Sequence, residues 1–408
     1  MLPSVDERTG NYTPQILGRA VGARTPGRRR NTYYMRRGPS RMEVVLCHDF
    51  EESSIEDVPR PEPGPDEVLI EVHRVQLSVT ECNLYRGERI AHYEAVESRL
   101  GSGGARLFGH EFCGRIAETG TDVTEFVEGD RVFAPGKIPC RECSTCDAGY
   151  HHYCKNIDSI GYERPGALAE YFTAPTAPLA KLHGDVSNAE GAAMQPFSTA
   201  VLSVHDAEIG TGDVVFVMGL GVMGAQCAQL ALEKGAGRVV GVDVVKEKLD
   251  IAERYGVETI HARKTDPVER TLIASDNVGA DVAFEAVGGN QGSLTAGETP
   301  LVQVFRALRT GGTLVQVGHI TGEVTATARD LRDKCLTWRH PLRGNPQLGP
   351  NASPGAVAPE LVSSGRITIE DHITHELDGL GSFEEAVEIT LNKGEYGALG
   401  PAQIVVSE

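Results

Sequence analysis

The sequence predicts an α/β protein in which a β-rich domain accompanies a doubly wound parallel sheet. From residue 42 to about residue 192, short β-like runs are broken by proline and glycine, which is typical of a β-rich domain with few helices. From about residue 211, strands alternate with helices, and a glycine-rich turn at residues 219–224 joins the first strand to the first helix. Strands that alternate with helices form a parallel sheet, because each helix returns the chain to the same edge.

The individual elements follow from local patterns. In the β-rich part, apolar runs rich in β-branched and aromatic residues predict strands at 44–47, 67–72, 131–134 and 167–173. In the second part, the same reasoning predicts strands at 214–218, 239–243, 281–285 and 313–317, and helical periodicity predicts helices at 224–234 and 246–255. A further helix at 382–391 and a closing strand at 403–406 are expected near the end of the chain.

The charge of the chain is unevenly distributed. The 408 residues carry a net charge of −18, but residues 1–41 hold nine arginines and only two acids, Asp6 and Glu7. The remainder has 30 basic and 55 acidic residues, a net charge of −25, which argues against nucleic acid and anionic membranes as partners.

Such an excess of carboxylates, with only nine lysines among 39 basic residues, suggests a halophilic protein. We expect it to fold and act best at high salt. Full stability in dilute buffer, measured by thermal unfolding across salt concentrations, would contradict this hypothesis.

Residues 1–41 are rich in Arg, Gly and Pro without periodicity, so we expect a disordered basic extension, with Met42 a candidate for the native start. No apolar stretch follows the N-terminal arginines as it would in a signal peptide. The most apolar segment, residues 214–232, contains a glycine turn, which favours a buried strand and helix over a membrane span. A cytoplasmic protein is therefore expected, and nine cysteines in such a chain favour metal binding over disulfides.

The glycine-rich turn predicts a dinucleotide site. Gly219 permits the tight turn, Gly221 lets a pyrophosphate approach the backbone, and Gly224 allows close packing of helix and strand. An acid that can bind the ribose, Asp243, ends the next strand, and no Arg follows it to hold a 2′-phosphate, which favours NAD over NADP. The expected cofactor-binding residues are Gly219, Gly221, Val222, Met223, Gly224, Asp243 and Lys248.

Four cysteines, Cys140, Cys143, Cys146 and Cys154, have the spacing of a closed tetrahedral zinc site. A site with four thiolates leaves no position open for substrate, so we expect a structural zinc ion. An empty thiol cluster, a redox pair and an iron–sulfur cluster are the alternatives.

A third motif, Gly109-His110-Glu111-Phe112-Cys113-Gly114, precedes the cysteines. Taken together and in this order, the three motifs resemble the medium-chain zinc-containing alcohol dehydrogenase family, with its polyol, sorbitol and threonine dehydrogenases, over essentially all of residues 42–408. The resemblance implies a GroES-like catalytic domain at 42–192 and 341–408, a Rossmann domain at 193–340, and an active site between them. It also implies a small-molecule substrate and a homodimer or homotetramer.

The chain departs from that family at the catalytic zinc. The family holds this ion by an early Cys, by the His of Gly-His-Glu, and by a later Cys or Glu. Here Ser78 stands at the first position and Gln195 at the last, so neutral groups replace two anionic ligands. The resemblance therefore implies these catalytic residues: Ser78, Thr80 as a proton relay, His110 and Glu111.

Two versions of this site remain open. In one, zinc still binds as a Lewis acid through His110 with help from Ser78, Glu111 or Gln195. In the other, the zinc is lost, and hydrogen bonds from Ser78, Thr80, His110 and Gln195 polarise the substrate oxygen.

The expected function is NAD-dependent oxidation of an alcohol, polyol or sugar hydroxyl to a carbonyl. A zinc-independent reductase of a C=C or C=O bond and a non-catalytic NAD-binding protein are the alternatives.

Overall fold

The computed structural model describes residues 40–408 apart from residues 102, 292–297, 342–343 and 351. Nearly all of the expected basic extension, residues 1–39, therefore lies outside the described residues. The first described strand is β1 (Arg41–Asp49), which contains the strand expected at 44–47.

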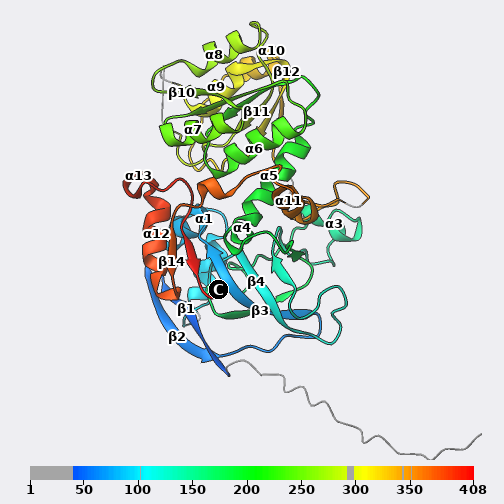
Figure 1. Ribbon diagram of the computed structural model, residues 1–408, viewed down its shortest axis with the longest axis vertical. Coiled ribbons are helices and arrows are strands. Elements are labelled where there is room, and N and C mark those ends of the chain that lie inside the picture. The colour runs from blue at the N-terminus through cyan, green and yellow to red at the C-terminus, as the bar shows by residue number, and fades with distance from the viewer. Residues whose placement is uncertain (1–39, 102, 292–297, 342–343, 351) are drawn as a thin grey trace, which may run out of the picture. The chain divides into compact units, whose positions relative to one another are not determined.

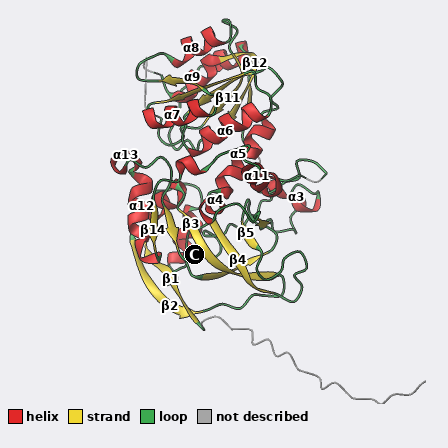
Figure 2. Ribbon diagram, in the orientation of Figure 1, coloured by secondary structure: helices red, strands yellow, loops and turns green. Residues whose placement is uncertain are grey.

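A six-stranded, wholly parallel sheet forms the second part of the chain (Figures 1 and 2). Its strand order, β10-β9-β8-β11-β12-β13, reverses direction beside β8, as in doubly wound dinucleotide-binding folds. The strands are β8 (Val214–Met218), β9 (Arg238–Asp243), β10 (Glu258–His261), β11 (Ala280–Glu285), β12 (Leu308–Gln316) and β13 (Thr337–Arg339).

Both faces of this sheet are buried, because alternate residues of a strand point to opposite sides. Val215 and Val217 of β8 pack in one apolar cluster, whereas Phe216 and Met218 pack in another. The helices of this part are α5 (Met194–Asp206), α6 (Val222–Glu233), α7 (Lys246–Arg254), α8 (Pro267–Ala274), α9 (Pro300–Ala307), α10 (Ala328–Asp333) and α11 (Pro354–Ser363).

The β-rich part is built on a seven-stranded sheet of order β14-β15-β3-β4-β5-β7, with β6 also paired to β3, and on the hairpin of β1 and β2. The chain returns to this sheet at its end, where β15 pairs antiparallel with β3. The strands are β2 (Glu52–Pro59), β3 (Glu67–Gln76), β4 (Glu111–Thr119), β5 (Arg131–Phe133), β6 (Tyr171–Pro175), β7 (Ala180–Lys181), β14 (Glu376–Asp378) and β15 (Gln403–Val405).

The β-rich part also contains short helices. They are α1 (Val79–Tyr85), α2 (Tyr93–Leu100), α3 (Ser144–Asp147), η1 (His151–Tyr153), α4 (Asn188–Ala192), η2 (Glu370–His372), η3 (Leu380–Ser382), α12 (Phe383–Leu391) and α13 (Lys393–Tyr396). No helix in the described part of the chain is both long enough and apolar enough to cross a bilayer.

Two local expectations are wrong. The strand expected at 167–173 begins only at Tyr171, because the residues before it bond elsewhere: Ala167 N–H donates to the Gly109 carbonyl, and the Leu168 carbonyl accepts from Val45 N–H. The strand-like sequence around Cys335 predicts a small buried side chain, but Cys335 is exposed because it lies in a turn after α10 with a φ of 51°.

Candidate functional site

A cavity of about 1050 Å³ joins the glycine loop to the Gly-His-Glu segment. The two sets of residues predicted from separate motifs therefore meet around one space. Among its lining residues are Ser78, Thr80, His110, Glu111, Gln195, Gly219, Gly221, Val222, Met223, Asp243 and Lys248. Gly224 is buried in the first turn of α6, behind the loop.

The glycine loop lies at the carboxyl edge of the parallel sheet, between the end of β8 and the start of α6. Gly219 has a φ of 94°, which disfavours any residue with a Cβ. A Cβ on Gly224 would lie only 1.8 Å from the Gly219 carbonyl oxygen. Gly221 caps α6 without a side-chain hydrogen bond, so the first N–H groups of this helix remain available to an anion.

Asp243 and Lys248 flank this loop. Asp243 Oδ2 accepts from Leu220 N–H at 2.9 Å, and Oδ1 accepts from Val244 N–H at 2.7 Å and Val245 N–H at 2.9 Å. The carboxylate thereby fixes the loop to the start of α7. Lys248 Nζ lies 4.0 Å from the position that a Cβ on Gly221 would take, beside the expected path of a pyrophosphate.

At the other end of the cavity, Glu81 holds His110. Ser78 is the N-cap of α1: its Oγ accepts from Glu81 N–H at 3.1 Å, and Glu81 Oε2 accepts from Ser78 N–H at 3.2 Å. Glu81 Oε1 accepts from His110 N–H at 3.1 Å and lies 2.7 Å from His110 Nδ1. Glu81 is 1% exposed, so a buried carboxylate fixes the imidazole with Nε2 left for the cavity.

This pairing shifts the pKa values of both groups. Burial opposes the charged imidazole, but the charge and hydrogen bond of Glu81 outweigh it and raise the pKa of His110. Burial likewise opposes the Glu81 carboxylate, but His110 and two backbone N–H groups hold the pKa of Glu81 below its usual value. None of the sequence motifs gave Glu81 a role. Its signal was the Ser78-x-x-Glu81 capping-box pattern.

Glu111 lies on the far side of His110 and is also buried. Its Oε1 is 3.8 Å from His110 Nε2, and its Oε2 accepts from Gln76 Nε2 at 2.6 Å. Burial raises the pKa of Glu111 to about 7, against the opposing effects of His110 and Gln76. Gln76 Oε1 in turn accepts from Gln403 Nε2 at 3.1 Å, so a strand from the end of the chain supports the site.

These residues do not form the ligand set of a catalytic zinc. Such an ion takes three protein ligands. His110 Nε2 and Glu111 Oε1 lie 3.8 Å apart, and no third His, Cys, Asp or Glu ligand atom of the described residues converges on them. The Ser78 oxygen caps α1, and Gln195 offers only a neutral amide. Among the described residues, the one group of three or more converging His, Cys, Asp or Glu ligand atoms is elsewhere.

Cys82 does not replace the missing thiolate. Burial raises its pKa well above the usual range of a thiol, and its side chain is hydrogen-bonded to Thr390. It therefore behaves as a neutral, buried thiol of α1 that contacts α12.

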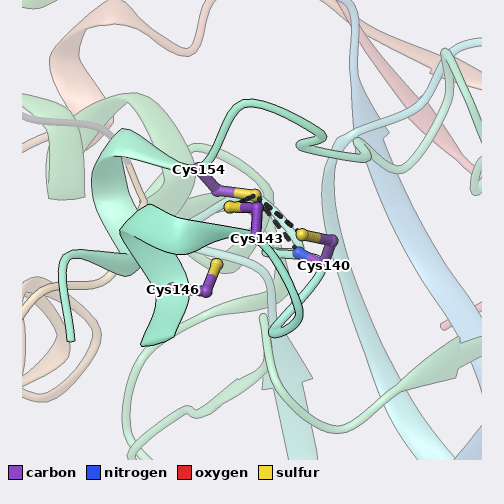
Figure 3. A group of neighbouring side chains, drawn as sticks. All are labelled: Cys140, Cys143, Cys146 and Cys154. Carbon is purple, nitrogen blue, oxygen red and sulfur yellow. Dashed lines mark hydrogen bonds between the residues drawn. The ribbon is translucent and has the colours of Figure 1, made fainter. Parts of the chain in front are cut away.

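The four cysteines do form a metal-ligand group. The Sγ atoms of Cys140, Cys143, Cys146 and Cys154 all lie within 4.8 Å of one another (Figure 3). Tetrahedral zinc with Zn–S bonds of about 2.3 Å requires sulfur atoms about 3.8 Å apart, and Cys143 and Cys154 are 3.9 Å apart. The Thr145 hydroxyl and backbone N–H groups lower the pKa of Cys143 to about 5, which favours the thiolate that zinc needs. The cluster fits a structural zinc ion.

Replacing Cys146 by serine is expected to reduce the zinc content and to lower the Tm by roughly 5–10 °C, because structural zinc contributes folding free energy. Metal analysis and thermal unfolding of the purified protein measure both. Cys335→Ser removes an exposed cysteine outside the cluster and serves as the control. Unchanged zinc content in Cys146→Ser would contradict the assignment.

Comparison with known proteins agrees with this geometry. Residues 64–184 match the model of the alcohol dehydrogenase GroES-like domain, and residues 219–358 match that of the zinc-binding dehydrogenases. Over 373 residues, 86% of this chain and 98% of the relative, it is 28% identical to the erythritol/L-threitol dehydrogenase of Mycolicibacterium smegmatis. It is 31% identical over 338 residues to the D-xylulose reductase A of Aspergillus niger, covering 81% of this chain and 87% of that protein.

A solved structure described as a zinc-binding dehydrogenase of Sinorhizobium meliloti 1021, bound to NADP, has a TM-score of 0.75 and 26% identity, covering 91% of this chain and all of that one. The fold, the cysteine cluster and the relatives fit a structural zinc and an NAD(P) cofactor. The protein is an oxidoreductase that acts on the CH–OH group of an alcohol or polyol. The chain belongs to the zinc-containing medium-chain alcohol dehydrogenase family.

Proposed function

We propose that the protein uses NAD⁺ to oxidise an alcohol, polyol or sugar hydroxyl to a carbonyl. The observation that carries this proposal is the single cavity lined by both the glycine loop and the His110 segment. A dehydrogenase must bring the nicotinamide and the reacting carbon into contact, and a cavity shared by the two motifs meets that requirement.

His110 is the residue suited to receive the hydroxyl proton. When bound, NAD⁺ accepts the hydride from the carbinol carbon, so the hydroxyl must lose its proton to the protein. His110 Nδ1 faces Glu81, which fixes the ring and stabilises the imidazolium that forms when Nε2 takes this proton. Ser78, Thr80 and Gln195 line the same space and can donate hydrogen bonds to the substrate oxygen. No step passes through a catalytic zinc.

Asp243 supports NAD rather than NADP. Its carboxylate lines the cavity at the end of β9, where it would repel a 2′-phosphate. The two residues that follow, Val244 and Val245, provide no cation to offset that repulsion.

Asp243→Asn is expected to lower the ratio of kcat/KM with NAD⁺ to kcat/KM with NADP⁺ by about 10-fold, since one nearby charge contributes roughly 1–2 kcal/mol. Asparagine keeps an oxygen for Val244 N–H and Val245 N–H but loses the acceptor of Leu220 N–H. The readout is therefore the ratio, because a weakened loop lowers the rates with both cofactors alike. Steady-state rates with both cofactors measure the ratio. A wild-type preference for NADP⁺ would contradict the assignment.

The experiment that tests the function is a screen for NAD⁺ reduction on alcohols, polyols and sugars, with the zinc content of the same sample. We expect turnover with about one zinc per chain, held by the cysteine cluster. Tight NADH binding without turnover on any substrate would favour a non-catalytic protein. A second zinc required for turnover would overturn the role of His110 but not the dehydrogenase activity. Assembly as a homodimer or homotetramer remains a prediction, which light scattering can check.

A further inference from the structure

A polar wall, made of His92, Lys137, Ser159 and Tyr162, lines the cavity beyond His110. These residues belong to no motif and have no part in the proposed hydride and proton transfers. Tyr162 connects the wall to the reactive end: its ring centroid is 5.3 Å from that of His110 and 4.3 Å from that of His92, on which it stacks. The wall thus begins one ring contact away from the proposed base, at Tyr162.

The donor and the acceptor of each hydrogen bond in the wall can be assigned. Lys137 Nζ lies 3.0 Å from His92 Nε2, and His92 Nδ1 lies 2.8 Å from Glu163 Oε1. Because an ammonium group can only donate, His92 Nε2 must accept, and His92 Nδ1 therefore donates to Glu163. The ammonium of Lys137 is in this way held in place by a neutral imidazole and balanced by the Glu163 carboxylate.

Ser159 is the second hydrogen-bonding group that the wall offers to a ligand. It is 5% exposed and lines the cavity, yet its hydroxyl has no hydrogen-bond partner among the residues that the structure describes. A buried hydroxyl without a partner costs free energy, and a ligand that bonds to it removes this cost. Ser159 can both donate and accept, as a hydroxyl group of a substrate also can.

We propose that Lys137 and Ser159 bind a second hydroxyl group of the substrate, so that the enzyme acts on an uncharged polyol rather than on a monoalcohol. This inference rests on the proposed dehydrogenase function. The charge of the wall favours a neutral ligand, because Glu163 already balances Lys137 through His92. A substrate that carries only the reacting hydroxyl would leave Ser159 without a partner.

The test compares kcat/KM for NAD⁺ reduction with four-carbon and five-carbon polyols and with 2-butanol, in the wild type, Lys137→Met and Ser159→Ala. We expect the polyol-to-butanol ratio of kcat/KM to fall about 10–30-fold in Lys137→Met and about 5-fold in Ser159→Ala, as expected for a charged and a neutral hydrogen bond. Ser159→Ala removes a hydroxyl that the fold does not use, so it should fold even if Lys137→Met does not. Lys181→Met, remote and half exposed, is the control and should leave the ratio unchanged.

Three other outcomes would contradict either this inference or the proposed function. An unchanged ratio in Ser159→Ala and in folded Lys137→Met would overturn the inference while leaving the dehydrogenase function intact. A wild-type preference for a polyol phosphate or sugar acid that is lost in Lys137→Met would also overturn it, because the site would then bind an anion. No NAD⁺ reduction with polyols or with 2-butanol would instead count against the proposed function itself.

Discussion

Replacing His110 by asparagine is expected to lower kcat/KM for alcohol oxidation by roughly 10²–10⁴-fold, the usual contribution of a positioned general base. Asparagine keeps the backbone N–H that donates to Glu81 but has no ring nitrogen to take the proton. The affinity for NADH should stay within about threefold of the wild type, since the glycine loop is untouched and His110 contributes to the chemical step. Steady-state kinetics and NADH fluorescence titration separate the two quantities.

The matched control is His183→Asn, at a histidine whose side chain is 45% exposed and which does not line the cavity. It should retain the wild-type rate. A near-normal rate in His110→Asn would show that another group removes the proton, and would exclude the role proposed for the Glu81–His110 pair.

Glu81→Gln gives an independent readout of the same pair. Glutamine can still complete the capping box with Ser78, but it removes the charge that raises the pKa of His110. The pKa of His110 should therefore fall. Because the neutral imidazole is the active base, the acid limb of the pH profile of kcat/KM should shift to lower pH, while the maximum rate decreases. A purely structural role of Glu81 would lower the rate without moving this limb.

The features that the sequence predicts well are those specified within a few residues. The glycine loop and the cysteine cluster each depend on short spacings, and the predicted bounds of β8 are those of the structure. Elements without local periodicity were missed. The hairpin strand β2 is largely exposed and polar, so no apolar alternation indicates it. Helix α5 is buried on nearly all sides and contains Pro196, so it lacks an amphipathic pattern.

The residues of the candidate site likewise fall into two groups: those that a local motif predicts, and those that only the fold brings together. His110 was found because a motif contains it, whereas Glu81 acts on it from 29 positions earlier, through the packing of α1 beside the start of β4. The residues of the polar wall come from three separate segments of the chain, and the orphaned hydroxyl of Ser159 is a property of the folded environment alone. Spacing in the sequence carries no information about such a site, because its segments lie far apart in the chain and meet only in the fold.

Replacing Gly221 by alanine is expected to raise the dissociation constant of NADH by roughly 100-fold or more while leaving the Tm nearly unchanged. In the structure, a Cβ at this position would meet only Lys248 Nζ, at 4.0 Å, and the backbone φ of −67° suits any residue. The fold therefore does not require this glycine. A methyl group there would instead occupy the space that the pyrophosphate needs in order to reach the N–H groups of α6. The substitution should therefore weaken NADH binding and leave the stability of the fold unchanged.

Gly224→Ala, three residues along the same loop, should do the opposite. Its Cβ would lie 1.8 Å from the Gly219 carbonyl oxygen, so the turn between β8 and α6 must open and the Tm must fall. Thermal unfolding without cofactor and NADH titration of both variants give the comparison. If Gly221→Ala bound NADH as tightly as the wild type, the loop would not be the pyrophosphate site, because an added methyl group and the phosphates cannot share the same volume. A Tm loss in Gly221→Ala equal to that in Gly224→Ala would mean that both glycines serve only the packing of α6 on the sheet.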